Sequence, residues 1–264
     1  MKFLITTFIL LIYLKSGLAS DNSVILTDKK EYYELGYHLE ILEDSTRKLT
    51  IEDVNNPDRL LKFKKSEAKV PNFGYSTSAF WLKIVVNNKS LKKDWLFSYN
   101  YYNQDKITFF KKVGNVWKGK TTGDTLPLKT REREARSFVF KVSPKNKTIY
   151  FFRIEGTDHL ANITIVTEEK FQKIEVRDYV YFSLFSGLAL GLILYNLLSL
   201  RYTKSISYLF YILYLKSFWF FISLDMGFSQ LLFFGNYPWF SNEGIALFVC
   251  LSSFLFLLFC INYL

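Results

Sequence analysis

The sequence predicts an exported all-β domain, a jelly roll or β-sandwich, followed by α-helical transmembrane segments. Short runs rich in β-branched and aromatic residues, separated by turn signals, fill the front of the 264-residue chain. The back is almost free of charge, since of the 34 Lys and Arg residues only Arg201, Lys204 and Lys216 lie beyond Asp178. This change in composition near residue 179 indicates a boundary between a water-exposed domain and a membrane domain.

The first residues predict a signal peptide at 1–19. Lys2 precedes an apolar run at 3–14, and the small residues of Gly17-Leu18-Ala19 suit a signal peptidase. The run is shorter than the ~20 residues that a membrane-spanning helix needs. An uncleaved anchor is the alternative interpretation, and in both cases the following domain is exported.

Cysteine usage indicates the compartment. Both cysteines, Cys250 and Cys260, lie in the last apolar run, so the expected domain at 20–178 has no disulfide. An exported domain of this kind must be stabilised by its own hydrophobic core. This fits a protein of the bacterial envelope better than a eukaryotic ectodomain. The Asn-x-Ser/Thr sequons point to a glycosylated ectodomain instead, but we interpret them as chance.

Strands are expected throughout the domain at 20–178, where apolar and polar residues alternate between turn signals such as Gly114-Asn115 and Gly123-Asp124. No long helical pattern separates the strands, which is typical of an all-β sandwich. The clearest expected strands are 80–88, 94–102, 106–113, 136–142, 148–156 and 162–166.

Three helices are expected in the membrane domain at 179–264, and none of them has a polar stripe of period 3.6. They are expected at 180–200, 206–224 and 244–264. The turn at Arg201–Lys204 should face the cytoplasm by the positive-inside rule, in agreement with an exported front. The aromatic loop at 225–243 should then lie outside. Three helices with nothing cytoplasmic after them suggest a truncated membrane domain.

No residues stand out as catalytic or metal-ligating, and no cofactor is predicted. The chain has only two histidines, His38 and His159, and we expect both at the surface. A pair of carboxylates of the glycosidase type stays open as an alternative, although no spacing singles one out. An exported domain rarely meets nucleic acid, so its basic excess predicts no such partner. The mixed-charge segment 129–137 is interpreted as a solvated loop.

Ligand binding is better supported, because sugar recognition by β-domains uses aromatic faces together with a few polar groups. For Trp81 and Trp95, which fall in alternating strands, a place in the core is favoured. The residues predicted to bind ligand are Tyr99, Tyr101, Tyr102, Asn103, Asp105, Trp117 and Arg153.

Several segments together resemble a known receptor family. In the front these are "HLEILEDSTRKLTIEDV" and "VPNFGYSTSAFWLKIVVNN", and in the back "GLALGLILYNLLSLRYTKSISYLFYILYLKSFWFFISLDMGFSQ". From about His38 onwards the chain is similar to the bacterial seven-transmembrane receptors with diverse intracellular signalling modules. Arg153 is similar to an arginine that recurs in a strand of that family, where a ligand contact and a structural ion pair are both open.

The resemblance implies a receptor of the bacterial inner (cytoplasmic) membrane. Its jelly-roll-like sensor domain, distantly related to carbohydrate-binding modules, lies in the periplasm on a seven-helix membrane domain, and its signalling enzyme follows the seventh helix. Three expected helices depart from that pattern. The function predicted is a membrane receptor that binds a small ligand, with carbohydrate as the candidate class, and couples it to the lipid-embedded helices. A partner or a missing C-terminal signalling module would supply the output. The alternatives are a membrane-tethered binding or scaffold protein without output and, third, a glycan-cleaving enzyme.

Overall fold

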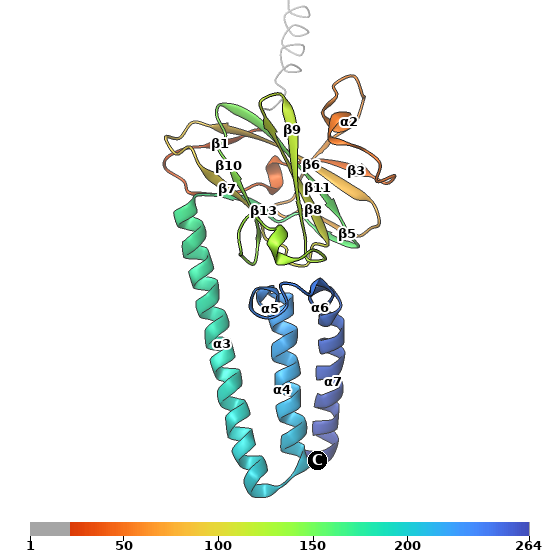
Figure 1. Ribbon diagram of the computed structural model, residues 1–264, viewed down its shortest axis with the longest axis vertical. Coiled ribbons are helices and arrows are strands. Elements are labelled where there is room, and N and C mark those ends of the chain that lie inside the picture. The colour runs from red at the N-terminus through yellow and green to blue at the C-terminus, as the bar shows by residue number, and fades with distance from the viewer. Residues whose placement is uncertain (1–21, 264) are drawn as a thin grey trace, which may run out of the picture.

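The computed structural model describes residues 22–263, as a β-domain followed by three long helices (Figure 1). The predicted signal peptide at 1–19 lies outside the described residues. The described front consists of mostly antiparallel sheets and the described back of apolar helices, so the predicted fold class is confirmed.

Two sheets make up most of the β-domain, and all their strand pairs except β1 with β6 are antiparallel. The seven-stranded sheet has the order β4 (Lys64–Lys65), β3 (Glu40–Asp44), β6 (Ala79–Asn88), β11 (Lys147–Glu155), β8 (Lys106–Val113) and β9 (Val116–Thr122), with β1 (Val24–Leu26) beside β6. The four-stranded sheet has the order β10 (Phe138–Val142), β7 (Trp95–Tyr99), β13 (Ile163–Val166) and β2 (Tyr32–Glu34). A short ribbon pairs β5 (Asn72–Tyr75) with β12 (Asp158–Leu160).

The main core lies between the two sheets and follows from the period-2 alternation of their strands. Along β6 every second side chain, from Phe80 to Val86, enters this core, and along β11 Phe152 does the same. From the facing sheet, Phe97 meets Phe152 edge to face at 5.5 Å between ring centroids. Aromatic pairs of this geometry add about 0.5–1.5 kcal/mol beyond the burial of their area.

The outer face of the seven-stranded sheet is covered by α2 (Ile51–Asn55). A capping box begins this helix, since the Thr50 hydroxyl accepts from the Asp53 backbone N–H and the Asp53 carboxylate accepts from that of Thr50. Ile51 and Val54 then pack over the completely buried Trp81. Trp81 thus fills a second core outside the sheet, whereas Trp95 fills the main one.

The outer face of the four-stranded sheet is covered by the start of α3 (Glu168–Thr203). Phe171 of α3 packs with Leu96, Val139 and Val166 of the sheet. A 36-residue helix is about 54 Å long, far more than the ~30 Å of a bilayer's hydrocarbon layer. The β-domain contact accounts for the excess, because α3 begins well before the helix expected at 180–200.

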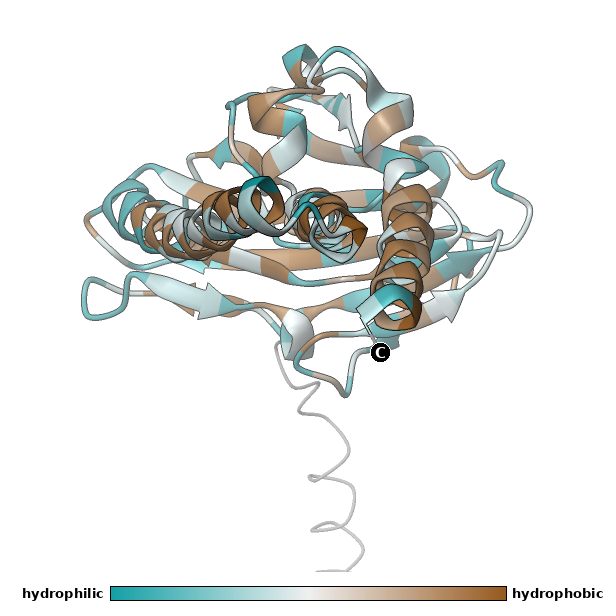
Figure 2. Ribbon diagram, turned by 90° about the horizontal axis from the view of Figure 1, so that it is seen from below, coloured by the Kyte–Doolittle hydropathy of each residue, from teal (hydrophilic) through white to brown (hydrophobic). Residues whose placement is uncertain are grey.

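Three helices of the described chain are long and apolar enough to cross a membrane: α3, α4 (Ile206–Asp225) and α7 (Gly244–Tyr263). Apolar residues predominate along them, as the brown stretches of the view from below show (Figure 2), and many of these side chains are exposed. Two polar contacts join them, from the Trp219 indole to the Ser186 hydroxyl at 2.9 Å and from the Ser207 hydroxyl to the Asn262 carbonyl at 2.8 Å. Their exposed apolar surface implies contact with lipid.

Two short helices connect α4 to α7 on the side that faces the β-domain. These are α5 (Phe228–Leu232) and α6 (Pro238–Asn242), which lie between the ends of the long helices and the β-domain (Figure 1). Exposed aromatic side chains at Phe233, Tyr237 and Trp239 mark this layer. Amphipathic rings at such a level are typical of the membrane–water interface.

Candidate functional site

The tyrosines predicted to bind ligand lie at the end of β7 and in the loop after it, but in different environments. Tyr99 is completely buried in the main core, where its hydroxyl donates to the Gln104 side chain at 3.1 Å. Tyr101 donates to the Asp158 carboxylate at 2.5 Å. Tyr102 packs instead against residues of the membrane domain. The loop therefore faces the helices, and ligand binding by these tyrosines stays a prediction.

Asn103 and Asp105 follow in the same loop and are half-buried. Burial raises the pKa of Asp105. Nearby His159 is completely buried, so the expectation of a surface histidine is wrong at this position. The reason is that both ring nitrogens have partners, namely Gln104 at 3.2 Å and the Ser76 carbonyl at 3.1 Å. Burial lowers the pKa of His159 and favours its neutral form.

The other two predicted residues, Trp117 and Arg153, lie on the outer face of the seven-stranded sheet. Trp117 meets Phe151 edge to face at 5.3 Å. Arg153 lies over Trp81, pairs with Glu155 and donates to the Arg47 carbonyl at 2.9 Å. Of the seven predicted residues, four lie in one loop: Tyr101, Tyr102, Asn103 and Asp105. Tyr99 lies in the main core, and Trp117 and Arg153 lie on the outer face of the seven-stranded sheet. The binding roles of all seven remain predictions.

The segment after the short helix at Leu128–Thr130 is the feature that sequence reasoning missed. Its interpretation as a solvated loop is wrong for Arg131 and Arg136, which are only 8% and 7% exposed. We call Arg131, Arg133 and Arg136 the arginine cluster. Their partners lie up to about a hundred residues away along the chain, so no local pattern signals their burial.

Arg136 has the most contacts of the cluster with the membrane domain. Its guanidinium pairs with the Asp178 carboxylate on α3 and donates to the Met226 carbonyl, at 3.2 Å, in the turn after α4. The same group lies over the rings of Tyr102 and Phe228, 4.8 and 4.4 Å from their centroids. Arg136 therefore joins the β-domain to α3 and to the α4–α5 turn at once.

We call this contact region between the β-domain and the membrane domain the junction. Arg133 contributes to it through α3, and Arg131 contributes through α5. Arg133 pairs with Glu168 at 2.5 Å and with Glu175 at 3.3 Å, which ties it to the first turns of α3. Arg131 donates to the Gln230 side chain on α5. A backbone bond of 2.8 Å from Leu128 to the Gly235 carbonyl reinforces the second link. The cluster therefore holds two separate parts of the membrane domain.

Asp124 is a buried carboxyl at the same junction. It is 2% exposed, its carbonyl accepts from Gln230 at 3.5 Å, and its Oδ1 atom has no hydrogen-bond partner among the described residues. Burial, followed by the charge of Asp105, raises the pKa of Asp124 to about 7, although Arg131 acts in the opposite direction. Burial also lowers the pKa of Arg131 to about 10, so Arg131 is still protonated at neutral pH.

The α4–α5 turn depends on Gly227, which has a φ of +73°. A Cβ atom added there would lie 3.0 Å from the Cβ atom of Tyr102. The next residue, Phe228, is completely buried and stacks on Phe182 of α3 with ring centroids 3.9 Å apart. The glycine thus allows the β-domain loop and the membrane turn to approach closely.

Substituting Gly227 with Ala is therefore expected to destabilise the junction by about 1–2 kcal/mol, since a left-handed backbone and a close contact are both penalised. The thermal midpoint of the detergent-solubilised protein would report this. Gly191→Ala is the matched control, because a Cβ atom at that helical position meets nothing within 4 Å. Equal midpoints for the two variants would contradict the tight approach at Gly227.

A polar pocket of about 490 Å³ lies beside the junction, between the four-stranded sheet and the start of α3. Tyr102 and Arg136 form part of its wall. The sheet side and the helix side contribute polar groups from Ser98, Asn100, Asn162, Lys170, Glu175 and Arg177. Among the described residues, including those of this pocket, no group of three or more His, Cys, Asp or Glu side chains is placed to hold a metal ion.

Two family models match the chain. Residues 36–167 match the 7TMR-DISM extracellular 2 domain, and residues 178–264 match the membrane domain described as 7TM diverse intracellular signalling. No curated protein matches the chain. The two matches follow the order of the β-domain and the membrane helices seen in the structure. The chain therefore belongs to the 7TMR-DISM family of membrane receptors, with its β-domain on the outer side of the membrane.

Proposed function

We propose that this receptor binds a small ligand in the pocket between the four-stranded sheet and α3, and that binding changes how α3 packs on the β-domain. The observation that carries the proposal is that both the β-domain and α3 line the pocket. Asn100 and Asn162 belong to the β-domain side, and Lys170 and Glu175 belong to α3. A ligand that contacts both sides interacts differently with each packing of α3. It therefore shifts the population between these packings.

The pocket lining favours a ligand with many hydroxyl groups, for which carbohydrate is the candidate class. Amide, hydroxyl and charged side chains provide hydrogen-bond partners, and the rings of Tyr32 and Tyr102 provide apolar faces. We place this site in the periplasm of a bacterium, with the helices in the inner membrane. The role is non-enzymatic, and the output comes from a partner or a C-terminal signalling module.

The binding step is tested by a panel of neutral oligosaccharides against the detergent-solubilised full chain, followed by thermal shift and calorimetry. Asn162→Ala combined with Lys170→Ala is expected to weaken a hit at least tenfold, because one lost charge-assisted hydrogen bond costs about 1.5–3 kcal/mol. Lys173→Ala is the control, since this exposed lysine lies on the same helix but outside the pocket. Unchanged affinity in the double variant would refute the site.

The coupling step separates a receptor from a tethered binding protein. Spin labels at Thr125 on the β-domain and Gln172 on α3, with both cysteines replaced by Ser, would report the distance between the two parts. Both labelled positions are exposed. A ligand-induced change in the distance distribution supports coupling, and an unchanged distribution in the ligand-saturated protein favours the tethered binder.

A further inference from the structure

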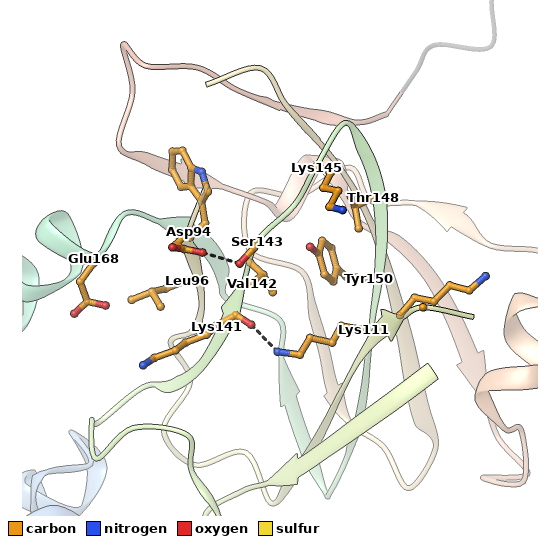
Figure 3. A pocket seen from close by; sticks show the side chains of 13 residues that line it. Asp94, Leu96, Lys111, Lys141, Val142, Ser143, Lys145, Thr148, Tyr150 and Glu168 are labelled. Atoms are coloured by element: carbon orange, nitrogen blue, oxygen red, sulfur yellow. Dashed lines mark hydrogen bonds between the residues drawn. The ribbon is translucent and has the colours of Figure 1, made fainter. Parts of the chain in front are cut away.

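A second and larger groove, of about 980 Å³, opens at one edge of the β-domain (Figure 3). It lies between β7 and β10 of the four-stranded sheet and β8 and β11 of the seven-stranded sheet. It shares no lining residue with the pocket beside α3. The groove is therefore separate from the proposed ligand site, although Glu168 at its edge also pairs with Arg133 of the arginine cluster.

Four lysines line the groove, and strand geometry accounts for their positions. Lys111 and Lys112 lie on β8, Lys141 lies on β10, and Lys145 lies in the turn before β11. Lys141 is the one exposed residue of β10, between the buried Phe140 and Val142. Three of these lysines belong to paired strands, so the sheets fix the backbone positions from which their ammonium groups extend.

The carboxylates of the groove already have hydrogen-bond or ion-pair partners, whereas the ammonium groups have no carboxylate partner among the described residues. Asp94 accepts from the Ser143 hydroxyl at 2.6 Å, and Glu168 accepts from Arg133 and from Gln172. Among the described residues, the four lysines form no ion pair. Lys111 donates only to the Lys141 carbonyl, at 2.9 Å, as Figure 3 shows. Four lysines and two carboxylates line the groove, and the charge of Lys141 also acts on Glu168, so the groove keeps a net positive charge.

The floor of the groove is aromatic and carries hydroxyl groups. Tyr150 is 3% exposed and is held by a stacked contact with Phe109, whose ring centroid lies 5.8 Å away. Within the described chain its hydroxyl makes no hydrogen bond, and the same is true of the nearby Thr148 hydroxyl. The Tyr150 ring itself is packed in the main core, also against Phe97 at 5.1 Å, so the floor offers the two hydroxyl groups, which suit the hydrogen-bonding groups of a sugar or polyol backbone.

The geometry points to a binding site for an anionic glycan, a saccharide or polyol chain that carries several carboxylate or phosphate groups. Lysine ammonium groups act as point charges without a fixed fork geometry, so they bind both carboxylate and phosphate groups along a flexible chain. The floor at Tyr150 and Thr148 binds the uncharged backbone between the charges. Uronic acid polymers and polyol phosphate polymers share this chemistry.

The test uses the detergent-solubilised full chain and three defined probes: an oligogalacturonate, a glycerol phosphate oligomer and a neutral malto-oligosaccharide of similar length. Calorimetry in 50 mM salt uses the Asn162→Ala/Lys170→Ala variant, whose pocket beside α3 is impaired. It is expected to show binding of one or both anionic probes and at least tenfold weaker binding of the neutral probe. Tighter binding of the uronate assigns an acidic polysaccharide, and tighter binding of the phosphate probe assigns a polyol phosphate. Failure of both anionic probes overturns the proposal.

A matched pair of charge reversals tests the location of the site. Lys112→Glu with Lys145→Glu changes two exposed groove lysines, and Lys118→Glu with Lys120→Glu makes the same change in net charge on β9, outside the groove. The groove pair is expected to weaken the anionic probe at least tenfold and the β9 pair less than twofold. Equal weakening would mean unspecific attraction and would overturn the site. Unchanged binding of the anionic probe in Asn162→Ala/Lys170→Ala separates this proposal from the pocket beside α3.

Discussion

Replacing Arg136 with Gln is expected to destabilise the junction between the β-domain and the membrane helices by about 3 kcal/mol. The substitution leaves the half-buried Asp178 carboxylate without its buried cation and removes the bond to the Met226 carbonyl. Removal of one partner from a buried ion pair typically costs about 3–5 kcal/mol, because the remaining charge is desolvated. Arg177 still pairs with Asp178, so the expected loss lies at the lower end of this range. The thermal midpoint and the hydrogen exchange of the α4–α5 turn would measure the loss.

Arg177→Gln is the matched control for this substitution. Arg177 pairs with the same carboxylate at 2.9 Å, but its side chain is 58% exposed. Exposed pairs contribute about 0–1 kcal/mol, since water screens the charges and the side chains lose entropy. The control is therefore expected to leave the midpoint and the exchange rates close to those of the parent protein. Equal effects of the two substitutions would show that Arg136 does not hold the junction.

Raising the pH from 5 to 8 is expected to destabilise the protein through Asp124. Its pKa rises from an ordinary value of 3.8 to about 7 in the folded protein, so folding keeps a proton on this carboxyl. The stabilisation from the bound proton is complete below pH 3.8 and is lost as the pH rises through 7. Between pH 5 and 8 the loss amounts to roughly 2–3 kcal/mol. Above pH 8 no further change is expected from this group.

Asp124→Asn isolates this contribution from other groups that titrate in the same range. The buried His159 acts in the opposite direction, because its lowered pKa costs stability as the pH falls below 6.5. The midpoint of Asp124→Asn, relative to the parent, should therefore rise between pH 5 and 8. Asp58→Asn, at an exposed position in the loop after α2, should show no such trend. A constant difference between Asp124→Asn and the parent across this range would refute the assignment.

Much of the β-domain is readable from local patterns. The alternation at 80–88 predicts a strand, and the structure shows it as β6, Ala79–Asn88, with every second side chain from Phe80 to Val86 in the main core. Alternation alone does not show what covers the other face. Trp81 is buried beneath α2, a five-residue helix whose apolar residues are too few to show a helical period in the sequence.

The candidate site was predictable only in part. The loop that contains Tyr101 and Tyr102 was recognisable from its aromatic and polar composition, but its orientation towards the membrane domain was not. The interpretation of the segment 129–137 as a solvated loop is wrong for the buried arginines, because alternating Arg and Glu residues are typical of a solvated surface. Burial of Arg136 requires Tyr102, Asp178 and the α4–α5 turn to meet, and these segments are distant in sequence.

Composition and strand period are thus enough to predict a β-domain followed by apolar membrane helices, because transfer from water to lipid and alternate burial depend on local residue types. The contacts between the arginine cluster, α3 and the α4–α5 turn exist only in the folded chain. They depend on loops that are distant in sequence and show no hydrophobic period, so no local pattern predicts them. The groove lined by four lysines likewise exists only in the folded chain, because the packing of the two sheets brings β8 and β10 together.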